Sequence, residues 1–401
     1  MNRFAALENK SFSGKLPVAI KQLALAVTIG LTCGGCQTSG GQYQAIEVTG
    51  FSDVIKHWND QNHRDPQPRY ALHQIRSIAD NILRYQRANR GWPENINPLR
   101  IMSEQEIARQ AALYSATDTS FDNRNVYPQI RYLAEAYQQT GDEKYQQAVI
   151  RGLRFILSAQ LANGGFTHSP PSTERYYGHI TIMDDVMAGV LGLLQEIKLG
   201  SQRFDFLPAD LVHQLSEAHG RGDALLLDLQ VKTDGKLTIW AGQYDANSLL
   251  PAQGRAFELA SLVSRESVDV VRYLMSDPTP SARKRQAIHS AMAWFKNNAL
   301  TGIDMVQVEA EPVRYKYHTS TWDRVIVTTA DSPPIWARFY DLANQQPLLA
   351  NRQGQRVDSL AQISRERRTG YDWYGRWPAP LLADEYKAWQ QKHAADGTNT
   401  Q

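Results

Sequence analysis

The sequence predicts a mainly α fold, in which repeated helical hairpins form a toroid or a solenoid and a small β region follows them. Apolar residues recur at helical spacing from about Tyr70 to Leu300, similar loop sequences return within that span, and β-branched residues dominate residues 303–329. The chain has 401 residues, of which 42% are hydrophobic, so we expect a folded globular domain with a large core.

Residues 1–35 are expected to be a signal peptide of the lipoprotein type and to lie outside the fold. The apolar segment "LALAVTIGL" (23–31) has the length of a signal-peptide core. The lysines that precede it are Lys10, Lys15 and Lys21.

Both cysteines of the chain follow this segment, in "TCGGC". The triplet "GGC" resembles the end of a bacterial lipobox, although Cys33 stands where Leu is usual, so we expect Cys36 to be lipidated. Gln37 is not Asp, which by the same resemblance favours an outer-membrane lipoprotein, at the periplasmic side or the cell surface. An ordinary cleaved secretion signal is the alternative. Residues 36–50 are expected to form a flexible tether.

The helices are predicted from their apolar stripes. "ALHQIRSIADNILRYQ" (71–86) places its branched aliphatic residues on one face, and "QIRYLAEAYQQTGDEKYQQAVIRGLRFILSAQ" (129–160) indicates two helices separated at Gly141. The segments 266–275 and 282–298 follow the same rule.

Three loop sequences recur at the ends of these helices. "QRANRGW" begins at Gln86, "QLANGGF" begins 74 residues later at Gln160, and "QVKTDGKLTIW" begins a further 70 residues on at Gln230. Each combines Gln, Asn or Asp, Gly and a large aromatic residue. A single Asn-Gly pair is ordinary helix-end chemistry, but three copies at similar spacing indicate repeated hairpins, whose loops would surround one concave face.

The pattern changes after the helices. "MVQVEA" (305–310), "VRYKYH" (313–318) and "DRVIVTT" (323–329) predict a small sheet. No segment between residues 51 and 392 has the composition of a linker, so we expect a single domain over 51–392 and a tail over 393–401.

The composition also excludes some classes of protein. A net charge of +2 does not fit a nucleic-acid-binding surface. No apolar run reaches the roughly 18 residues of a membrane span, so we expect membrane contact only through an anchor at Cys36. We expect the protein to be a monomer.

Polar side chains lie beside two predicted helices. Asp122 and Asn123 come shortly before one helix, and Asp184 and Asp185 stand at the start of another. Each is explained singly as a helix cap. Together, Asp122, Asn123 and Asp184 could supply oxygen ligands for a hard cation such as Ca²⁺, which prefers oxygen.

Three arginines have apolar or turn neighbours. Arg255 lies in "PAQGRAFELASL" (251–262), which is otherwise suited to a core helix, Arg338 lies in "WARFYD", and Arg352 lies in "NRQGQ". Pairing with Glu258, stacking on a ring and exposure in a turn are the simple explanations. As a set, they could bind carboxylates bidentately.

Several motifs, in order along the chain, resemble family 10 polysaccharide lyases, which are pectate lyases. They are "RANRGWPEN", "FDN" with "QIRYLA", "ITIMDD", "PAQGRAFELASL", "PPIWARFY" and "RERRTGYDWYGRWP". Two departures are Glu94, where Lys is expected, and Met183, where Asn is common. Both concern the substrate subsites.

The resemblance implies an α/α toroid that cleaves polygalacturonate by calcium-dependent anti β-elimination and releases unsaturated oligogalacturonides. It implies Ca²⁺ and substrate at Asp122, Asn123 and Asp184, Arg255 as the catalytic base, and carboxylate binding by Arg338 and Arg352.

Further substrate contacts are expected from Asp185, Tyr177 and Trp92, together with other tryptophans that could stack on sugars. Asp185 is also expected to cap the helix that begins at Val186, although the sequence leaves open whether Asp184 and Asp185 exchange these roles. A Lys or a Tyr is the alternative base, and Tyr176 and Tyr177 lie shortly before the aspartate pair.

Arginine is an unusual base because its pKa is above about 12. Burial among other cations is expected to lower that pKa and to give an alkaline optimum.

Two other functions stay open on the residues alone. A glycoside hydrolase on an α/α toroid would use two acids, from Asp122, Asp184 and Asp185, but has little use for three arginines. A lipid-anchored protein that binds acidic oligosaccharides would share the arginines and aromatic residues without catalysing a reaction.

Overall fold

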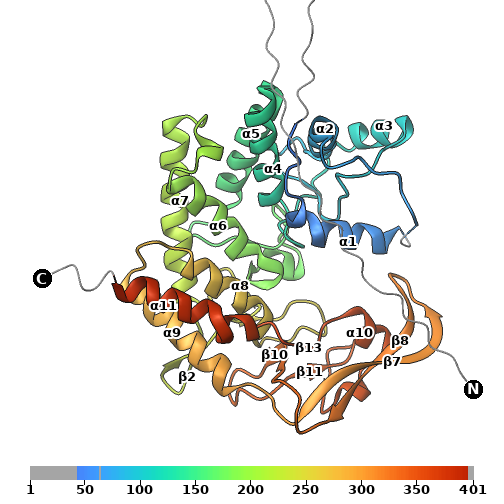
Figure 1. Cartoon of the computed structure of the whole chain (residues 1–401), viewed down its shortest axis with the longest axis vertical. Coiled ribbons are helices and arrows are strands. Elements are labelled where there is room, and N and C mark those ends of the chain that lie inside the picture. Colours follow the sequence, from blue (N-terminus) through green and yellow to red (C-terminus); the bar gives the residue numbers. More distant parts are fainter. Residues whose placement is uncertain (1–42, 63–64, 396–401) are drawn as a thin grey trace, which may run out of the picture. The chain divides into compact units, whose positions relative to one another are not determined.

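The computed structural model describes residues 43–62 and 65–395 (Figure 1). The predicted signal peptide, Cys36, the first part of the predicted tether and the end of the predicted tail lie outside the described residues.

The described part of the chain is rich in helices, as predicted. The α-helices are α1 (Ser52–Gln61), α2 (Ile75–Tyr85), α3 (Glu104–Ala112), α4 (Tyr127–Thr140), α5 (Glu143–Ala159), α6 (Val186–Lys198), α7 (Ala209–Asp228), α8 (Ser264–Met275), α9 (Ala282–Asn297), α10 (Arg365–Gly370) and α11 (Tyr386–Ala395). Gly141 has φ 63° and ends α4, because the left-handed conformation that turns the chain there favours glycine.

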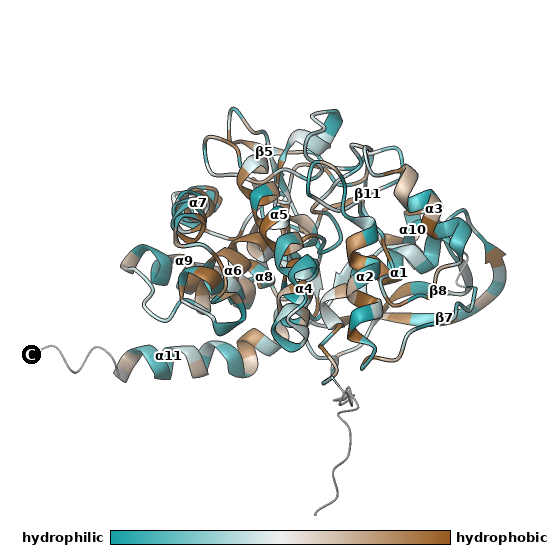
Figure 2. Ribbon diagram, turned by 90° about the horizontal axis from the view of Figure 1, so that it is seen from above, coloured by the Kyte–Doolittle hydropathy of each residue, from teal (hydrophilic) through white to brown (hydrophobic). Residues whose placement is uncertain are grey.

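The helices form the predicted α/α toroid. Consecutive helices pair as α4 with α5, α6 with α7 and α8 with α9, while α2, α4, α6 and α8 pack in succession and α5, α7 and α9 pack outside them. Burial follows this order, since 10 of 13 residues are buried in α6 but 8 of 20 in α7. Figure 2 accordingly shows α6 as largely hydrophobic, whereas α11 is mixed. An inner helix is enclosed by neighbours, whereas an outer helix keeps one polar face.

The three recurring loops make the same contacts, and we call residues 86–92, 160–166 and 230–240 the clasp loops. In each, the Gln side-chain amide donates one hydrogen bond within its own loop and one to the outer helix of the next hairpin. The acceptors are the carbonyls of Arg90 and Ala148 for Gln86 (3.0 and 3.1 Å), of Gly164 and Ala218 for Gln160 (3.1 and 2.8 Å), and of Thr238 and Ala287 for Gln230 (2.9 and 3.0 Å). The predicted repeat is therefore confirmed.

The aromatic residues of these loops belong to the core. The indole N–H of Trp92 donates to the Ile82 carbonyl (2.8 Å), and that of Trp240 donates to the Leu226 carbonyl (2.7 Å). Both residues are 0% exposed. The expectation that Trp92 binds substrate is therefore wrong, because the buried ring is enclosed by protein and its one polar atom is satisfied. Trp336 and Trp373 are equally enclosed.

The predicted β region is a two-stranded hairpin. β7 (Ile303–Arg314) pairs antiparallel with β8 (Thr319–Thr328), and a register shift falls between Glu309 and Val313. The segment 313–318, expected to be a separate strand, forms the end of β7 and the turn.

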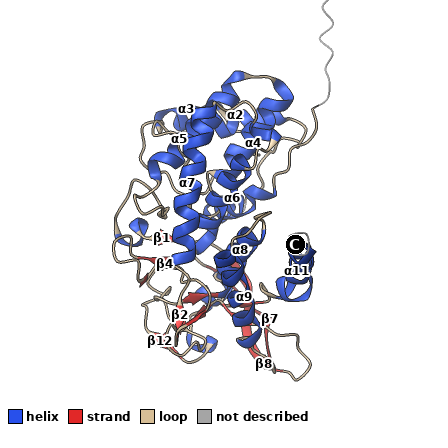
Figure 3. Ribbon diagram, turned by 90° about the vertical axis from the view of Figure 1, so that its left-hand side faces the viewer, coloured by secondary structure: helices blue, strands red, loops and turns tan. Residues whose placement is uncertain are grey.

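Short strands link the helices near the site, and Figure 3 shows strands gathered toward one end of the domain. They are β1 (Ile180–Thr181), β2 (Lys232–Thr233), β3 (Lys236–Leu237), β4 (Gln243–Tyr244), β5 (Pro251–Ala252), β6 (Leu262–Val263), β9 (Trp336–Ala337), β10 (Phe339–Tyr340), β11 (Leu349–Ala350), β12 (Arg356–Val357) and β13 (Tyr374–Gly375).

Both ends of the domain extend beyond their predicted positions. Within the expected tether, Ile46 is buried in the core, and the Tyr43 hydroxyl accepts a hydrogen bond from Arg76 Nε (2.9 Å). At the other end, α11 runs past residue 392 to Ala395. None of the described helices is long and apolar enough to cross a bilayer.

Candidate active site

Carboxylates gather where the inner helices begin. Asp122 and Asn123 precede α4, Asp184 precedes α6, and Glu266 lies in the first turn of α8. The N-terminus of a helix carries partial positive charge from unpaired N–H groups, so three such ends favour anions nearby.

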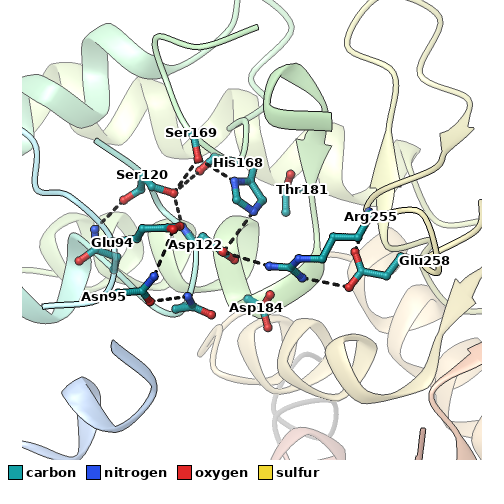
Figure 4. Close-up of polar contacts among 12 residues, drawn as sticks. Glu94, Asn95, Ser120, Asp122, His168, Ser169, Thr181, Asp184, Arg255 and Glu258 are labelled. Atoms are coloured by element: carbon teal, nitrogen blue, oxygen red, sulfur yellow. Dashed lines mark hydrogen bonds and ion pairs between the residues drawn. The ribbon is translucent and has the colours of Figure 1, made fainter. Parts of the chain in front are cut away.

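Asp122 is the centre of this cluster. His168 Nε2 lies 3.2 Å and Arg255 Nη2 lies 3.4 Å from its Oδ2, and Figure 4 shows both side chains pointing at it. Its other oxygen, Oδ1, is buried without a hydrogen-bond partner in the described structure. Burial alone would raise the pKa of Asp122, but His168 and Arg255 hold that pKa well below its usual value. Asp122 is therefore an anion with one unused acceptor.

The two aspartates before α6 face different surroundings. Both have left-handed backbone conformations, with φ 51° at Asp184 and 64° at Asp185. Burial, reinforced by the nearby Asp122, raises the pKa of Asp184 to about 7. Asp185 accepts a hydrogen bond from the Tyr127 hydroxyl (2.9 Å), and burial with Asp269 nearby raises its pKa to about 7. Asp185 makes no side-chain capping bond to α6, so its predicted capping role is wrong.

Arg255 lies in an irregular loop between β5 and β6, where we expected a helix. Its Nη1 lies 2.9 Å from Glu258 Oε1, and its backbone N–H donates to Glu258 Oε2 (2.9 Å), so the pair forms within a turn. Glu258 and Asp122 raise the pKa of Arg255 well above its usual value, against the opposing effect of burial. The expectation of a lowered pKa is wrong for this structure, because Arg255 is surrounded by anions rather than cations.

Arg338 joins β9 to β10 and is 3% exposed. Its Nε donates to Glu266 Oε1 (3.0 Å), its Nη2 lies 3.7 Å from Asp184 Oδ1, and its guanidinium lies 4.5 Å from the centre of the Tyr371 ring. Burial opposes the charge of Arg338, but Glu266 holds its pKa above the usual value. Ring stacking, the simple explanation for Arg338, is confirmed, and its guanidinium contacts two carboxylates of the protein itself.

Arg352 lies at the rim. It is exposed in the turn between β11 and β12, and its Nη1 lies 3.0 Å from Glu366 Oε2. A Cβ atom added at Gly354, in the same turn, would lie 2.6 Å from the Ala256 carbonyl. The turn therefore rests against the loop that carries Arg255.

A chain of amides and acids continues from Asn123. The Asn123 side-chain amide donates to Asn95 Oδ1 (2.8 Å), and the Asn95 amide donates to Glu94 Oε1 (3.1 Å). Burial, with Asp122 close by, raises the pKa of Glu94 to about 7. The departure noted in the sequence therefore adds a carboxyl group beside Asp122.

The tyrosines before the aspartate pair lie against His168. The ring centres of Tyr177 and His168 are 5.2 Å apart, and those of Tyr176 and His168 are 5.1 Å apart. Burial raises the pKa of Tyr176 to about 12.

The residues that sequence reasoning missed as site residues are His168, Glu266 and Tyr371. The Tyr371 hydroxyl donates to Glu258 Oε1 (2.7 Å), so Tyr371 contacts both Arg338 and the partner of Arg255. Tyr371 lies within the motif "RERRTGYDWYGRWP", but no local pattern marks His168 or Glu266, because their partners lie far along the chain. Among the described residues, no group of three or more His, Cys, Asp or Glu side chains is arranged to hold a metal ion.

Comparisons with known proteins indicate one family. The family model described as pectic acid lyase matches residues 86–382. A family 10 polysaccharide lyase from Cellvibrio cellulosa is 26% identical with a TM-score of 0.67, and the match covers 86% of this chain and 98% of that one. A mutant of that lyase in complex with trigalacturonic acid matches with the same identity and TM-score and covers 99% of its own chain. Comparison with curated proteins gave no match.

The chain is an α/α toroid whose site combines acids and arginines, and the family 10 polysaccharide lyases match most of its length. It is therefore a polysaccharide lyase. The chain belongs to the pectic acid lyase family and is a pectate lyase.

Proposed function

We propose that this lyase cleaves polygalacturonate by calcium-dependent anti β-elimination and releases unsaturated oligogalacturonides. The observation that carries the proposal is Asp122, a buried anion with one unpaired oxygen, placed between Arg255 and His168 and close to Asp184. The complex of the Cellvibrio relative with trigalacturonic acid supports an oligogalacturonide as ligand.

The donor set fits calcium. Asp122, Asn123 and Asp184 offer oxygen atoms. Burial and, after it, repulsion from Asp122 raise the pKa of Asp184, and a bound cation would offset both effects. Two carboxylates and an amide leave most of the 6–8 calcium positions for the substrate and water. When bound, Ca²⁺ would neutralise the uronate carboxylate and so make the neighbouring C5 proton more acidic.

The chain's own residues perform the elimination. Arg255 removes the C5 proton, the electron pair forms the C4–C5 double bond, and the C4–O bond breaks with its oxygen taking a proton from water. Arg338, held by Glu266, and Arg352 bind uronate carboxylates and keep the sugar ring oriented. The preorganised cations offset the negative charge that develops as the proton leaves.

Proton removal by Arg255 requires its neutral form, which Glu258 and Asp122 disfavour in the free enzyme. Occupation of Asp122 by a cation would weaken one of these contacts. Because the neutral fraction still grows with pH, we expect the rate to rise through the alkaline range.

One assay tests the reaction. Purified protein is incubated with polygalacturonate, with calcium or with a chelator, while ultraviolet absorbance and reducing ends are followed. Absorbance that rises only with calcium supports the proposal. Reducing ends without absorbance would indicate a hydrolase, and binding without product would indicate an oligosaccharide-binding protein.

We also propose that Cys36 carries a lipid that anchors the enzyme at the outer membrane. Fractionation of cells that express the native chain or Cys36→Ser tests this. Release of the variant from the membrane fraction supports the anchor, and identical fractionation contradicts it.

A further inference from the structure

The turn of the β7–β8 hairpin presents aromatic and cationic side chains together. Arg314, Lys316 and Tyr317 are exposed, and Tyr317 retains 42% of its surface. Lys316 Nζ lies 4.9 Å from the centre of the Tyr317 ring, and the rings of Tyr315 and His318 are 5.0 Å apart. In the described part of the chain, Arg314 and Lys316 form no ion pair, so both charges are available to an anion. We call residues 314–318 the hairpin tip.

The hairpin tip is fixed to α10 rather than free. His318 Nε2 lies 2.8 Å from Thr369 Oγ1, and Arg365 Nε donates to the Trp322 carbonyl (3.1 Å). Arg368 pairs with Asp323 on β8 through two contacts. Figure 1 shows β7 and β8 extending past α10. The position of the hairpin tip is therefore set by contacts with the segment that leads to Tyr371.

This segment leads from the hairpin tip to the active site. Thr369, which contacts the hairpin tip, is two residues from Tyr371, so their Cα atoms are at most about 7 Å apart. Tyr371 in turn contacts Glu258 and Arg338. Arg367, on the same segment as Thr369 and Tyr371, makes a further contact with the site. Its guanidinium lies 5.3 Å from the centre of the ring of Phe257, which belongs to the loop that carries Arg255.

The charges along this path suit a polyanion. Glu366 is shared by Arg352 and Arg367, which leaves one positive charge in excess, and the hairpin tip adds two more. Rings stack on sugar faces and cations pair with carboxylates, so alternating Tyr and Lys or Arg match a chain whose every sugar carries a carboxylate.

We propose that the hairpin tip binds a uronate segment of the polysaccharide several sugars away from the scissile bond. This inference rests on the proposed function, because it assigns a remote part of the same substrate. The hairpin tip then raises the affinity for long chains and contributes nothing for a trisaccharide whose three sugars are held at the active site.

The test compares substrate lengths in Arg314→Ala/Lys316→Ala and in Tyr317→Ala. These side chains are exposed, so folding is retained. For each variant we expect KM for polygalacturonate to rise about three- to tenfold. The value of kcat for either substrate, and KM for trigalacturonate, should be unchanged. The matched control, Glu309→Gln/Glu311→Gln, removes exposed charges of opposite sign from the same hairpin and should leave KM for polygalacturonate equal or lower. An unchanged KM for polygalacturonate, or an equal rise for both substrates, would overturn the inference.

A binding measurement separates this inference from the proposed reaction. In electrophoresis through gels that contain polygalacturonate and a chelator, the native protein should be retarded and both hairpin-tip variants less so, without any turnover. Absence of an unsaturated product refutes the reaction, whereas equal retardation refutes the hairpin-tip site. If the hairpin-tip variants lost binding to vesicles of anionic phospholipid but were retarded in the gel as strongly as the native protein, the hairpin tip would bind a lipid surface. That result would also overturn the inference.

Discussion

The clasp loops and the active site use similar polar side chains at helix ends for opposite purposes. In the clasp loops, Gln86, Gln160 and Gln230 each donate to two backbone carbonyls. In the active site, Asp122 keeps an unpaired oxygen, and the pKa of Asp184 is raised to about 7. Hydrogen-bonded amides stabilise a fold, whereas crowded carboxylates store free energy that a ligand can release. Among the three clasp-loop glutamines, Gln230 is the exception, because its Oε1 is buried without a hydrogen-bond partner in the described residues. The following changes test this comparison.

The largest effect is expected at Arg255. Arg255→Ala should reduce kcat at least about 1,000-fold, which corresponds to about 4 kcal/mol of transition-state stabilisation, while substrate binding largely survives. Initial rates from ultraviolet absorbance and binding by calorimetry measure the two quantities. A near-normal rate in this variant would disprove the assignment of the base.

Arg255→Lys distinguishes a base from a fixed cation. The ordinary pKa of Lys, about 10.4, is lower than that of Arg, so a lysine base would shift the alkaline limb of the pH–rate profile to lower pH. A profile with an unmoved limb would indicate that residue 255 acts only through its charge.

Asp184→Asn is expected to reduce calcium-dependent activity by less than Arg255→Ala does, and to stabilise the protein. The folded-state pKa of Asp184 is raised to about 7, so folding favours its neutral form, and the free energy of unfolding should fall as pH rises from about 4 to about 7. The variant should remove part of this fall and gain about 1–3 kcal/mol at pH 8. Urea denaturation at pH 5 and pH 8 measures it.

Calcium provides the control for Asp184. Added Ca²⁺ should stabilise the native protein at pH 8 and have less effect on Asp184→Asn. Equal stabilities of the two proteins at both pH values would show that folding does not raise the pKa of Asp184.

Gln160→Ala should have the opposite signature. It removes the donor to the Gly164 and Ala218 carbonyls and should lower the free energy of unfolding by about 1–3 kcal/mol, with kcat of the folded enzyme unchanged. Gln138→Ala is the matched control, because exposed Gln138 makes one such bond, to the Gln202 carbonyl. A large loss of kcat in Gln160→Ala would erase the distinction between the two regions.

The smallest effect is expected at the rim. Arg352 is exposed and paired with Glu366, so Arg352→Ala should raise KM for polygalacturonate only about two- to fivefold. Steady-state kinetics check this, and a loss as large as that of Arg255→Ala would move Arg352 from the rim to the chemistry.

The sequence predicted the clasp loops well because their chemistry is local. Gln, Gly and an aromatic residue recur within a few positions, and the periodicity of the intervening helices was sufficient to predict the hairpins. The aromatic residues themselves were misjudged, because a ring in a loop can face either the core or a ligand. Trp92 was assigned to substrate, whereas its indole N–H is satisfied inside the protein.

The site was predicted in part. Asp122, Asp184, Arg255 and Arg338 meet in space as the resemblance to pectate lyases implied. The pairing of Arg255 with Glu258, one of the simple explanations of the sequence, is confirmed, although it forms in a turn and not on a helix. Its consequence was not predicted, since this pair raises the pKa of Arg255 instead of lowering it.

The side-chain amides of the clasp loops also bear on how the domain opens. Gln86 reaches α5, Gln160 reaches α7 and Gln230 reaches α9, so each hairpin is linked to the one that follows it. Repeat arrays without such links tend to fray from their ends. Here the release of one hairpin breaks the hydrogen bond that joins a loop glutamine to the next hairpin. The slowest amide hydrogen exchange is therefore expected to proceed by opening of all the hairpins as one cooperative unit.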